Sequence, residues 1–235
     1  MTTPLFSIIM PVWNRSGIVR RAIASVGKQQ FTDYELIIVD DGSTDRLEDS
    51  VAPFLRDERI CLVRIPHRGV GAARNEGLRL ARGTWIAYLD SDNTWDPAYL
   101  SRMHAALAGS PEIRTAYCRF NQFNRLPVLH IPYLWKIGGE PFGYEKLLEE
   151  NFIDINTFVH ARECSNETGP WDETLKRLVD WDFIIRMTAR YPPLYVAEPL
   201  VNYYYQVHGD SISSREPIGP ALEAVREKIR RMKKP

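Results

Sequence analysis

Short apolar runs and amphipathic segments alternate through the first 90 residues, and this alternation limits the possible folds more than any other feature of the sequence. Four runs have the length and composition of strands buried on both faces: 6–12, 35–39, 60–65 and 84–89. Segments with helical spacing lie between them, the first ending at Gly27 and the others covering 45–55 and 71–81. Strands that alternate with helices form a parallel sheet with helices on its faces. The sequence therefore predicts an α/β fold with a mostly parallel central sheet flanked by helices.

The rest of the chain is less regular. Aromatic residues, prolines and short apolar runs at 115–120 and 127–135 favour mixed or antiparallel strands joined by long loops. We expect a helix opened by acids at 180–190, strands interrupted by Pro199 at 194–206, and a helix that becomes basic towards its end at 216–234. No internal repeat or low-complexity linker divides the sequence, so one domain over 1–235 is expected, with halves at 1–110 and 111–215 and a C-terminal helix at 216–235.

Charge and cysteine content exclude several classes of protein. The 30 basic and 30 acidic residues cancel, which removes the overall positive field of a nucleic-acid-binding protein. The three cysteines, Cys61, Cys118 and Cys164, are too widely spaced for a metal motif and too few for a disulfide scaffold. The sequence has no apolar run of the roughly 18 to 20 residues that cross a bilayer and no signal-peptide pattern at its start, so a cytoplasmic protein is expected.

Carboxylates follow two of the predicted strands. Asp40 and Asp41 come directly after the run at 35–39, and Asp90 and Asp92 follow the run at 84–89. The carboxyl ends of parallel strands form the edge at which open α/β sheets bind their ligands. Two carboxylates one residue apart can hold a divalent cation while substrate phosphates fill its other coordination positions. The same residue types also form ordinary polar turns, so both interpretations stand at this point.

Four segments resemble, in order and spacing, the motifs of family 2 glycosyltransferases: SIIMPVWNR at 7–15, ELIIVDDGSTD at 35–45, GVGAARNEGLRLARGTWIAYLDSDN at 69–93 and GPWDETLKRLVDWDFIIR at 169–186. The similarity covers residues 5–215. It implies the GT-A fold, a nucleotide-binding Rossmann-like domain whose mixed second half binds the acceptor. It also implies transfer of a sugar from a nucleotide diphosphate donor, first of all a UDP-sugar, to a hydroxyl of a glycan or a lipid-linked saccharide, usually with inversion at the anomeric carbon.

The resemblance assigns the donor site residue by residue. The nucleotide-binding positions are Pro11, Val12, Asp41, Arg74 and Asp90. Among these, Asp41 would accept a hydrogen bond from the base, and the cation of Arg74 suits a diphosphate. Asp90 is the first acid of the DxD motif, near the ribose. Asp92 is its second acid and would meet Mg²⁺ or Mn²⁺ on the pyrophosphate, which implies one of these metals as cofactor.

The family's general base is an aspartate in an acidic motif, often Glu-Asp, at the start of a helix. Asp180 aligns with this base, although Val179 stands where the glutamate is expected. That departure leaves Asp182 as an alternative base. Acids in a first turn also stabilise the helix dipole, so both have a purely structural interpretation as well.

Three further positions match the family more loosely. His208 follows an aromatic strand, as a histidine does in many relatives, and is a candidate ligand of the metal or the pyrophosphate. Trp171 and Asp172 match a segment that lines the acceptor side, where an aromatic ring can stack on a sugar. The alternative for Trp171 is a place in the core. Between Asn121 and Asn156 the sequence has no recognisable motif.

Two other functions compete with a sugar transferase. A dinucleotide-dependent oxidoreductase is suggested by Gly69-x-Gly71-x-x-Arg74 with Asp90 further on, but Arg74 occupies the place of the third glycine and three residues separate the strand from the turn. A sugar-nucleotide-binding protein without catalytic activity is suggested by the missing glutamate at 179, whereas the presence of Asp41, Asp92 and Asp180 favours an enzyme.

The C-terminal helix carries a local positive charge in a neutral chain. Six of the nine residues from Arg226 to Lys234 are basic and one, Glu227, is acidic. Such a cluster could attach the protein peripherally to an anionic membrane that carries the acceptor. It could equally complement the helix C-terminus while the apolar residues of the helix pack on the domain.

Overall fold

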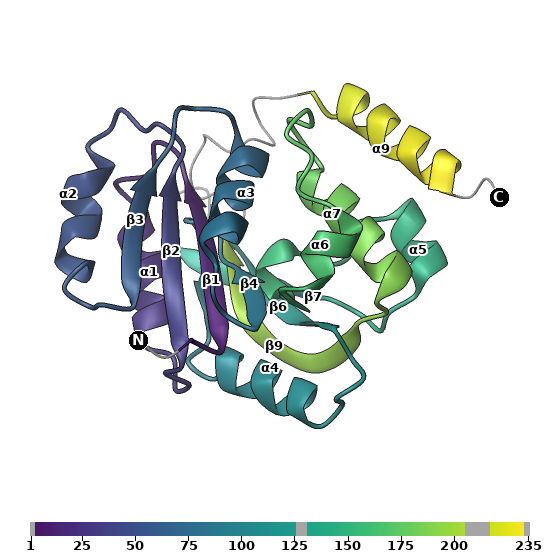
Figure 1. The fold of residues 1–235 in the computed structure, drawn as a ribbon, viewed down its shortest axis with the longest axis horizontal. Helices are drawn as coiled ribbons and strands as arrows, with labels where there is room; N and C mark the ends of the chain where they lie inside the picture. The colour runs from purple at the N-terminus through teal and green to yellow at the C-terminus, as the bar shows by residue number, and fades with distance from the viewer. Residues whose placement is uncertain (1–2, 126–130, 205–216, 233–235) are drawn as a thin grey trace.

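The computed structural model describes residues 3–125, 131–204 and 217–232, which form one nine-stranded sheet with helices on both faces (Figure 1). The strands are β1 (Phe6–Val12), β2 (Tyr34–Asp40), β3 (Ile60–Arg64), β4 (Trp85–Tyr88), β5 (Thr94–Trp95), β6 (Thr115–Arg125), β7 (Pro132–Gly138), β8 (Phe158–Ala161) and β9 (Leu194–Tyr204). The helices are α1 (Val19–Gly27), α2 (Leu47–Val51), α3 (Val70–Leu80), α4 (Tyr99–Ala108), α5 (Tyr144–Glu149), α6 (Cys164–Thr168), α7 (Val179–Arg190) and α9 (Ile218–Met232), with 3₁₀ turns η1 (Ala52–Phe54) and η2 (Ile155–Thr157).

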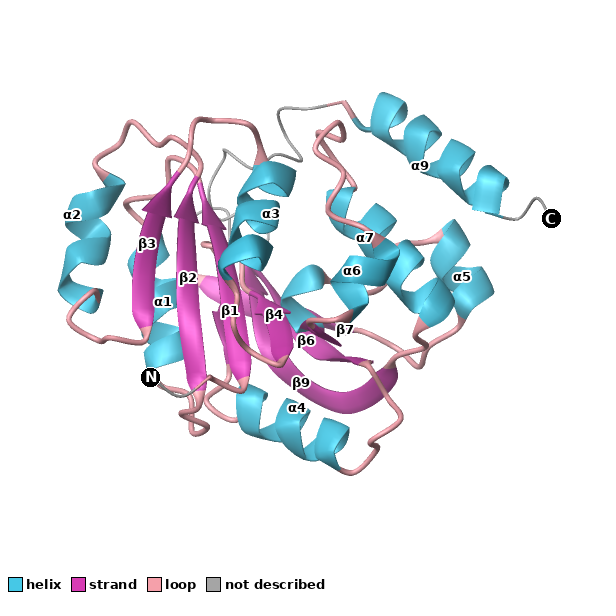
Figure 2. Ribbon diagram, in the orientation of Figure 1, coloured by secondary structure: helices cyan, strands magenta, loops and turns pink. Residues whose placement is uncertain are grey.

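The strand order is β3-β2-β1-β4-β8-β6-β9-β5, with β7 added to β6. Strands β3, β2, β1 and β4 are parallel, so their carboxyl ends lie at one edge of the sheet, at the top of Figure 2. Strand β8 is antiparallel to both β4 and β6, and β7 is antiparallel to β6. The predicted α/β fold with a parallel first half and a mixed second half is therefore confirmed.

Alternate residues of the central strands pack in two different cores, which explains their continuous apolar sequence. Ile8 and Met10 of β1 pack with α1 and α4 on one face of the sheet, whereas Ile9 packs with α3 and α7 on the other. All seven residues of β1 and all seven of β2 are buried. Burial on both faces fixes the register of these strands, and with it the position of the loops that follow them.

The second half departs from the sequence prediction in two places. Strand β9 is continuous from Leu194 to Tyr204 and is not interrupted by Pro199; its register against β6 shifts beside Arg119 instead. A bulge accommodates a proline because it relieves the need for a backbone donor. The run expected at 127–135 lies partly outside the described residues, and the observed strand covers Pro132–Gly138. In the first half, one element also differs: the helix expected at 45–55 is shorter and ends as an α-helix at Val51.

Helix α9 packs against the domain through its apolar face, as Figure 1 shows beside α7. Val225 is fully buried, and Leu222 and Ile229 pack against the same core as α7. Cys61, Cys118 and Cys164 are all free thiols. In the described ranges, every helix falls short of the length and apolarity needed to cross a membrane.

Candidate functional site

A cavity of about 850 Å³ lies at the carboxyl ends of β1, β2 and β4 and reaches the start of α7. It is lined by seven of the residues that the sequence singles out: Pro11, Val12, Asp41, Arg74, Asp90, Asp92 and Asp180. These residues come from five separate segments of the chain. Their convergence in one cavity is what a binding site at the switch point of an α/β sheet requires.

Hydrogen bonds between loops fix the nucleotide-side edge of this cavity. Asn14, which has a positive φ of 51°, accepts a hydrogen bond from the backbone N–H of Thr44, and its own N–H donates to the Ser43 hydroxyl. The N–H of Ser16 donates to the carboxylate of Asp45 at 2.7 Å. The loops after β1 and β2 therefore hold each other in place before any ligand binds.

Asp41 organises the loop that precedes α3. Its two carboxylate oxygens accept the backbone N–H groups of Arg68 and Gly69, each at 2.8 Å, and His67 Nδ1 lies 2.8 Å from one of them. The His67 ring stacks on Trp13 with centroids 4.3 Å apart, and both rings line the cavity. Oδ2 meets both Gly69 and His67, whereas Oδ1 accepts only the Arg68 N–H among the described residues, so Oδ1 keeps an acceptor direction for a base beside this aromatic pair.

Arg74 and Asp90 form a half-buried ion pair in the floor of the cavity. The Arg74 side chain is 5% exposed, and its Nη2 donates to Asp90 Oδ1 at 2.9 Å. The guanidinium also lies over the ring of Trp171, 4.6 Å from its centroid. Stacking and ion pairing together fix the plane of the guanidinium, which leaves a rigid cation beside the predicted diphosphate position.

Asn156 joins Asp90 to Asp154, a residue that the sequence analysis missed. The side chain of Asn156 accepts from the Asp90 N–H at 2.6 Å and donates to Asp154 Oδ1 at 2.7 Å and to Asp90 Oδ2 at 3.2 Å. Asn156 is fully buried. Such a fully used buried amide holds both carboxylates at defined positions. Asp154 therefore lies in the same cavity as Asp90, Asp92 and Asp180.

Asp92 is held at a high energetic cost in its ionised form. Burial and then the neighbouring Asp90 raise the pKa of Asp92 to about 6, although Arg15 and Arg21 oppose the shift. A divalent cation would relieve this repulsion. Among the described residues, no three acids, histidines or cysteines lie close enough to hold a metal by themselves. The donor set fits a Mg²⁺ or Mn²⁺ ion that is bound by one or two carboxylates and completed by substrate phosphates.

Asp180 lies in the first turn of α7, at the far side of the cavity. Leu178, directly before the helix, has a φ of 56°, a left-handed conformation that costs a residue with a side chain about 1 kcal/mol or more. Asn151 donates a hydrogen bond to Asp180 Oδ2 at 3.2 Å. The strained turn and the amide together aim the carboxylate into the cavity, where a general base has to meet its substrate.

The structure does not bring Asp182 or Asp172 to the wall of this cavity. Asp182 is 2% exposed and pairs with Arg186 at 2.9 Å and with Lys228 of α9 at 2.8 Å. Lys228 also binds Asp172. Burial alone would raise the pKa of Asp172, but hydrogen bonds from Lys228 and Thr174 lower it to about 2. These acids anchor α9 to α7 and to the segment before it, a structural role that the sequence analysis did not foresee.

Lys228→Met is expected to lower the free energy of unfolding by about 2 to 3 kcal/mol. The substitution leaves the buried Asp182 with one cation fewer, and unpaired buried charges are strongly destabilising. Lys146→Met, which removes an exposed pair with Glu140, is the matched control and should lower it by less than about 1 kcal/mol. Urea unfolding of both variants measures the difference, and equal effects would contradict the anchoring role.

The remaining sequence candidates have different fates. Trp171 is 1% exposed and stacks on Phe183 with centroids 3.9 Å apart, so the structure places it in the core and not on a cavity wall. Its indole N–H approaches the Tyr88 hydroxyl at 3.3 Å. Trp171 therefore supports the site from behind, through Arg74. His208 lies outside the described residues.

The sequence analysis did not single out several residues that line the cavity. Lys176 and Arg177 precede Asp180 in the quoted segment 169–186, and their charges could have signalled a diphosphate site. Asp154, Asn151 and Tyr203 lie in stretches without a recognised motif. Only the packing of β9 and of the segment before η2 brings them to Asp180.

The Asp154 carboxyl gives stability a defined pH dependence. Burial raises the pKa of Asp154 to about 7, with contributions from Asp90 and Asp180, against hydrogen bonds from Asn156. The folded chain therefore binds this proton more tightly than the unfolded chain, so the carboxyl lowers the free energy of unfolding as the pH rises from about 4 to about 7.

Asp154→Asn removes this effect and keeps an oxygen for Asn156. We expect the melting temperature of the variant, relative to the unchanged protein, to increase from pH 5 to pH 8. Asp172→Asn is the control, because the pKa of Asp172, about 2, and its ordinary value both lie below pH 5, so its effect should be the same at both pH values. A constant difference for Asp154→Asn as well would contradict the expectation.

Comparison with known proteins gives the site a context. The sequence model of the family described as "Glycosyl transferase family 2" matches residues 7–162. A "PGL/p-HBAD biosynthesis glycosyltransferase" of Mycobacterium tuberculosis is 30% identical over 188 residues, which cover 79% of this chain and 70% of the relative. The "Putative colanic acid biosynthesis glycosyl transferase WcaA" of Escherichia coli is 31% identical over 219 residues, covering 88% of this chain and 74% of the relative.

Solved structures share the fold at lower sequence identity. The crystal structure of Staphylococcus aureus TarS residues 1–349 in complex with UDP-GlcNAc has a TM-score of 0.77 and 18% identity, and covers 94% of this chain. The present chain spans 64% of the length of that structure. The mannosyltransferase PcManGT from Pyrobaculum calidifontis, in complex with GDP-Man and Mn²⁺, has a TM-score of 0.66 and 17% identity, covering 96% of this chain and 70% of the other.

Proposed function

The chain belongs to glycosyl transferase family 2 and is a glycosyltransferase, and on that basis we propose that it transfers a sugar from a UDP-sugar to a hydroxyl group with inversion at the anomeric carbon. The observation that carries the proposal is the single cavity of about 850 Å³ that brings Asp41, Arg74, Asp92 and Asp180 together. The nucleoside would lie along Pro11 and the Trp13–His67 pair, and Asp41 would accept a hydrogen bond from its base. The diphosphate would lie between Arg74 and Asp92.

The proposed reaction is one displacement. The acceptor oxygen forms a bond to the anomeric carbon while the bond from that carbon to the diphosphate oxygen breaks and its electron pair leaves with the nucleoside diphosphate. Asp180 takes the proton of the attacking hydroxyl, which requires a carboxylate within about 3 Å of it. One carboxylate is enough for a single inverting step, so a second acid of the kind that glycosidases use is not needed.

We propose that Asp92, with Asp90 beside it, holds Mg²⁺ or Mn²⁺ on the donor. Two properties support the assignment: the raised pKa of Asp92, caused by burial and by Asp90, and the position of both carboxylates on the wall of the cavity. When bound, the metal would neutralise charge on the leaving diphosphate. The role of Arg74 is then to hold Asp90 in place and to add a second positive charge nearby.

Family membership removes the oxidoreductase alternative, but it leaves an inactive sugar-nucleotide-binding protein as a second candidate. The absence of a glutamate before Asp180 motivates that candidate, because the family motif is then incomplete. The hydrogen bond from Asn151 to Asp180 supports an active enzyme, since it positions the base by other means. Slow hydrolysis of a bound donor would identify the active form.

Thermal stabilisation by nucleotides tests the donor site directly. The full chain is heated with UDP, GDP, UDP-glucose, UDP-GlcNAc and GDP-mannose, each with Mn²⁺, with Mg²⁺ or with EDTA. We expect the uridine compounds to raise the melting temperature, and more strongly with metal, because a ligand that binds only the folded state stabilises it. No stabilisation by any nucleotide would contradict the proposed function. A response to GDP compounds alone would show that the donor is a GDP-sugar and not a UDP-sugar.

We further propose a glycan or a lipid-linked saccharide as acceptor, and a peripheral contact between α9 and an anionic membrane. The exposed basic residues of α9, Arg226, Arg230 and Arg231, support the contact, whereas Lys228 is engaged with Asp182. Cosedimentation with vesicles of varied anionic lipid content tests it. Binding should decrease when these three arginines are changed to glutamine; binding that is absent or unchanged contradicts this part of the proposal.

A further inference from the structure

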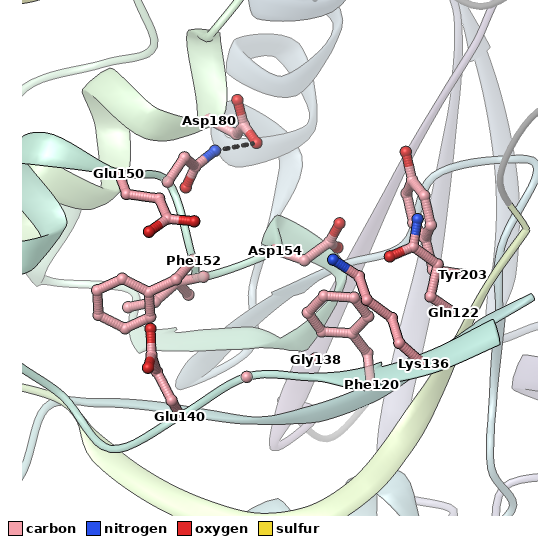
Figure 3. A pocket seen from close by; sticks show the side chains of 13 residues that line it. Phe120, Gln122, Lys136, Gly138, Glu140, Glu150, Phe152, Asp154, Asp180 and Tyr203 are labelled. Carbon is pink, nitrogen blue, oxygen red and sulfur yellow. Dashed lines mark hydrogen bonds between the residues drawn. The ribbon is translucent and has the colours of Figure 1, made fainter.

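A second, smaller cavity of about 360 Å³ adjoins the donor cavity and shares Asp154, Asp180 and Tyr203 with it. Figure 3 shows its two sides. Strands β6, β7 and β9 contribute one side, and the segment before η2 together with the start of α7 contributes the other. Its volume lies at the lower end of the range for small-molecule sites, enough for a compact ligand beside Asp180.

Gln122 of β6 is the feature of this cavity that calls for a ligand. The residue is 7% exposed, and its amide makes no hydrogen bond with another described residue; its polar atoms are not fully buried and are open to the cavity. An amide that is open to a cavity and is not used by the protein is available for hydrogen bonds with a ligand. In Figure 3 the Gln122 side chain extends from its strand into the cavity. An amide both donates and accepts, as a sugar hydroxyl does.

The other lining residues restrict the chemistry of the ligand. Phe120, Phe152 and Tyr203 supply aromatic surface, on which the apolar face of a sugar ring can pack. Glu150, Asp154 and Asp180 supply carboxylates, whereas Lys136 is the one basic residue among the described lining residues. The remaining acid, Glu140, is already paired with Lys146. The balance of charge therefore disfavours a ligand that carries a carboxylate or a phosphate.

We propose that the smaller cavity is the acceptor subsite, that it takes an uncharged or amino-bearing sugar ring, and that Gln122 hydrogen-bonds a hydroxyl of that ring. The inference rests on the proposed function, because Asp180 is the base for the hydroxyl that attacks. It adds to that function the chemical class of the acceptor's terminal residue. Gln122 selects for a hydroxyl by its position, and Glu150 with Asp154 selects against an anionic ring by charge.

Ligand-observed NMR on the full chain with UDP and Mg²⁺ tests the proposal. The probes are methyl glucoside, methyl galactoside, methyl glucosaminide and methyl glucuronide. We expect saturable binding of at least one neutral or amino glycoside and weaker binding of the glucuronide. Gln122→Leu should weaken glycoside binding about tenfold, as expected for the loss of one hydrogen bond, while UDP binding is unchanged. Its melting temperature should stay nearly unchanged, because the leucine removes no hydrogen bond to another described residue.

Two control variants separate recognition from general damage. Gln29 is similarly buried, but its amide donates to the carbonyl oxygens of Ser25 and Asp96 and accepts the Leu100 N–H. Gln29→Leu should therefore destabilise the fold without a selective effect on glycoside binding. Glu150→Gln should reduce the ratio between the affinities for the glucoside and the glucuronide about two- to fivefold, as expected for the loss of one exposed charge. Glu149→Gln, the neighbouring exposed acid outside the cavity, should leave the ratio unchanged.

The outcomes distinguish this inference from the proposed function. If no nucleotide stabilises the chain with metal, the proposed function itself fails. If UDP binds but no neutral or amino glycoside does, the acceptor subsite is wrong. The subsite is also wrong if Gln122→Leu binds the glycoside as well as the unchanged protein does, or if the glucuronide binds as tightly as the glucoside.

Discussion

Asp180→Asn is expected to lower the turnover of the donor by at least about 100-fold while the affinity for UDP stays nearly unchanged, because loss of a general base removes a transition-state interaction. Asparagine keeps the shape of the side chain and an oxygen that can still accept the Asn151 hydrogen bond. The fold should therefore be preserved. Single-turnover hydrolysis or transfer from a UDP-sugar, together with UDP titration, measures the two quantities separately.

Asp182→Asn is the matched control, two residues further along α7. Asp182 is buried against Arg186 and Lys228, so removal of its charge should lower the melting temperature, and any loss of activity should follow the loss of folded protein. If Asp182→Asn lost turnover at an unchanged melting temperature and Asp180→Asn kept it, the base would be Asp182. The geometry predicts the opposite, since Asp180 lines both cavities and Asp182 lines neither.

Asp92→Asn is expected to remove most of the contribution of Mn²⁺ to UDP binding. Groups that merely support a metal ligand often contribute 10- to 100-fold to metal affinity, so loss of a ligand itself should weaken metal-supported binding at least about tenfold. Binding of UDP in EDTA should change little. The substitution also removes an acid whose pKa is raised to about 6 by burial and by Asp90, so the fold should not be weakened at neutral pH.

Asp96→Asn serves as the control for this prediction. Asp96 is an exposed acid four residues further along, outside the cavity, whose carboxylate accepts the Ala98 N–H, a role that asparagine can also fill. Calorimetric titration of UDP with Mn²⁺ and with EDTA should give the unchanged values for this variant. Equal metal dependence in Asp92→Asn and in the unchanged protein would exclude Asp92 as a ligand.

The parallel half of the fold could be predicted because it depends on local pattern. The runs at 6–12 and 35–39 are apolar except for Ser7 and Glu35, which hydrogen-bond each other, and this pattern has few solutions other than a strand covered on both sides. The acids that follow such strands must lie at the carboxyl edge of the sheet. For that reason Asp41, Asp90 and Asp92 could be assigned to one cavity before any coordinates were known.

The second half could not be predicted in the same way, because its strands pair across long stretches of chain. Strand β9 is parallel to β6, from which it is separated by β7, β8 and the helices α5, α6 and α7, and it carries Tyr203 to the cavity. Pro199 suggests an interruption locally, but the register shift beside Arg119 accommodates it. No local sequence signal encodes such a pairing, because the register of β9 depends on its neighbouring strand β6, which is distant in the sequence.

The amino-acid sequence by itself indicated the α/β architecture and the acids at the carboxyl edge of its parallel strands, and it offered both Asp180 and Asp182 as candidate bases. Only the tertiary structure decided what surrounds each of them. Asp182 meets Lys228 from a helix 46 residues away, and Asp180 meets Asn151 from 29 residues away. Residues two apart on a helix point in different directions. Asp182 therefore lies in a buried ion pair, whereas Asp180 lines the cavity. Burial and partners, which depend on long-range packing, set the chemistry of a carboxylate.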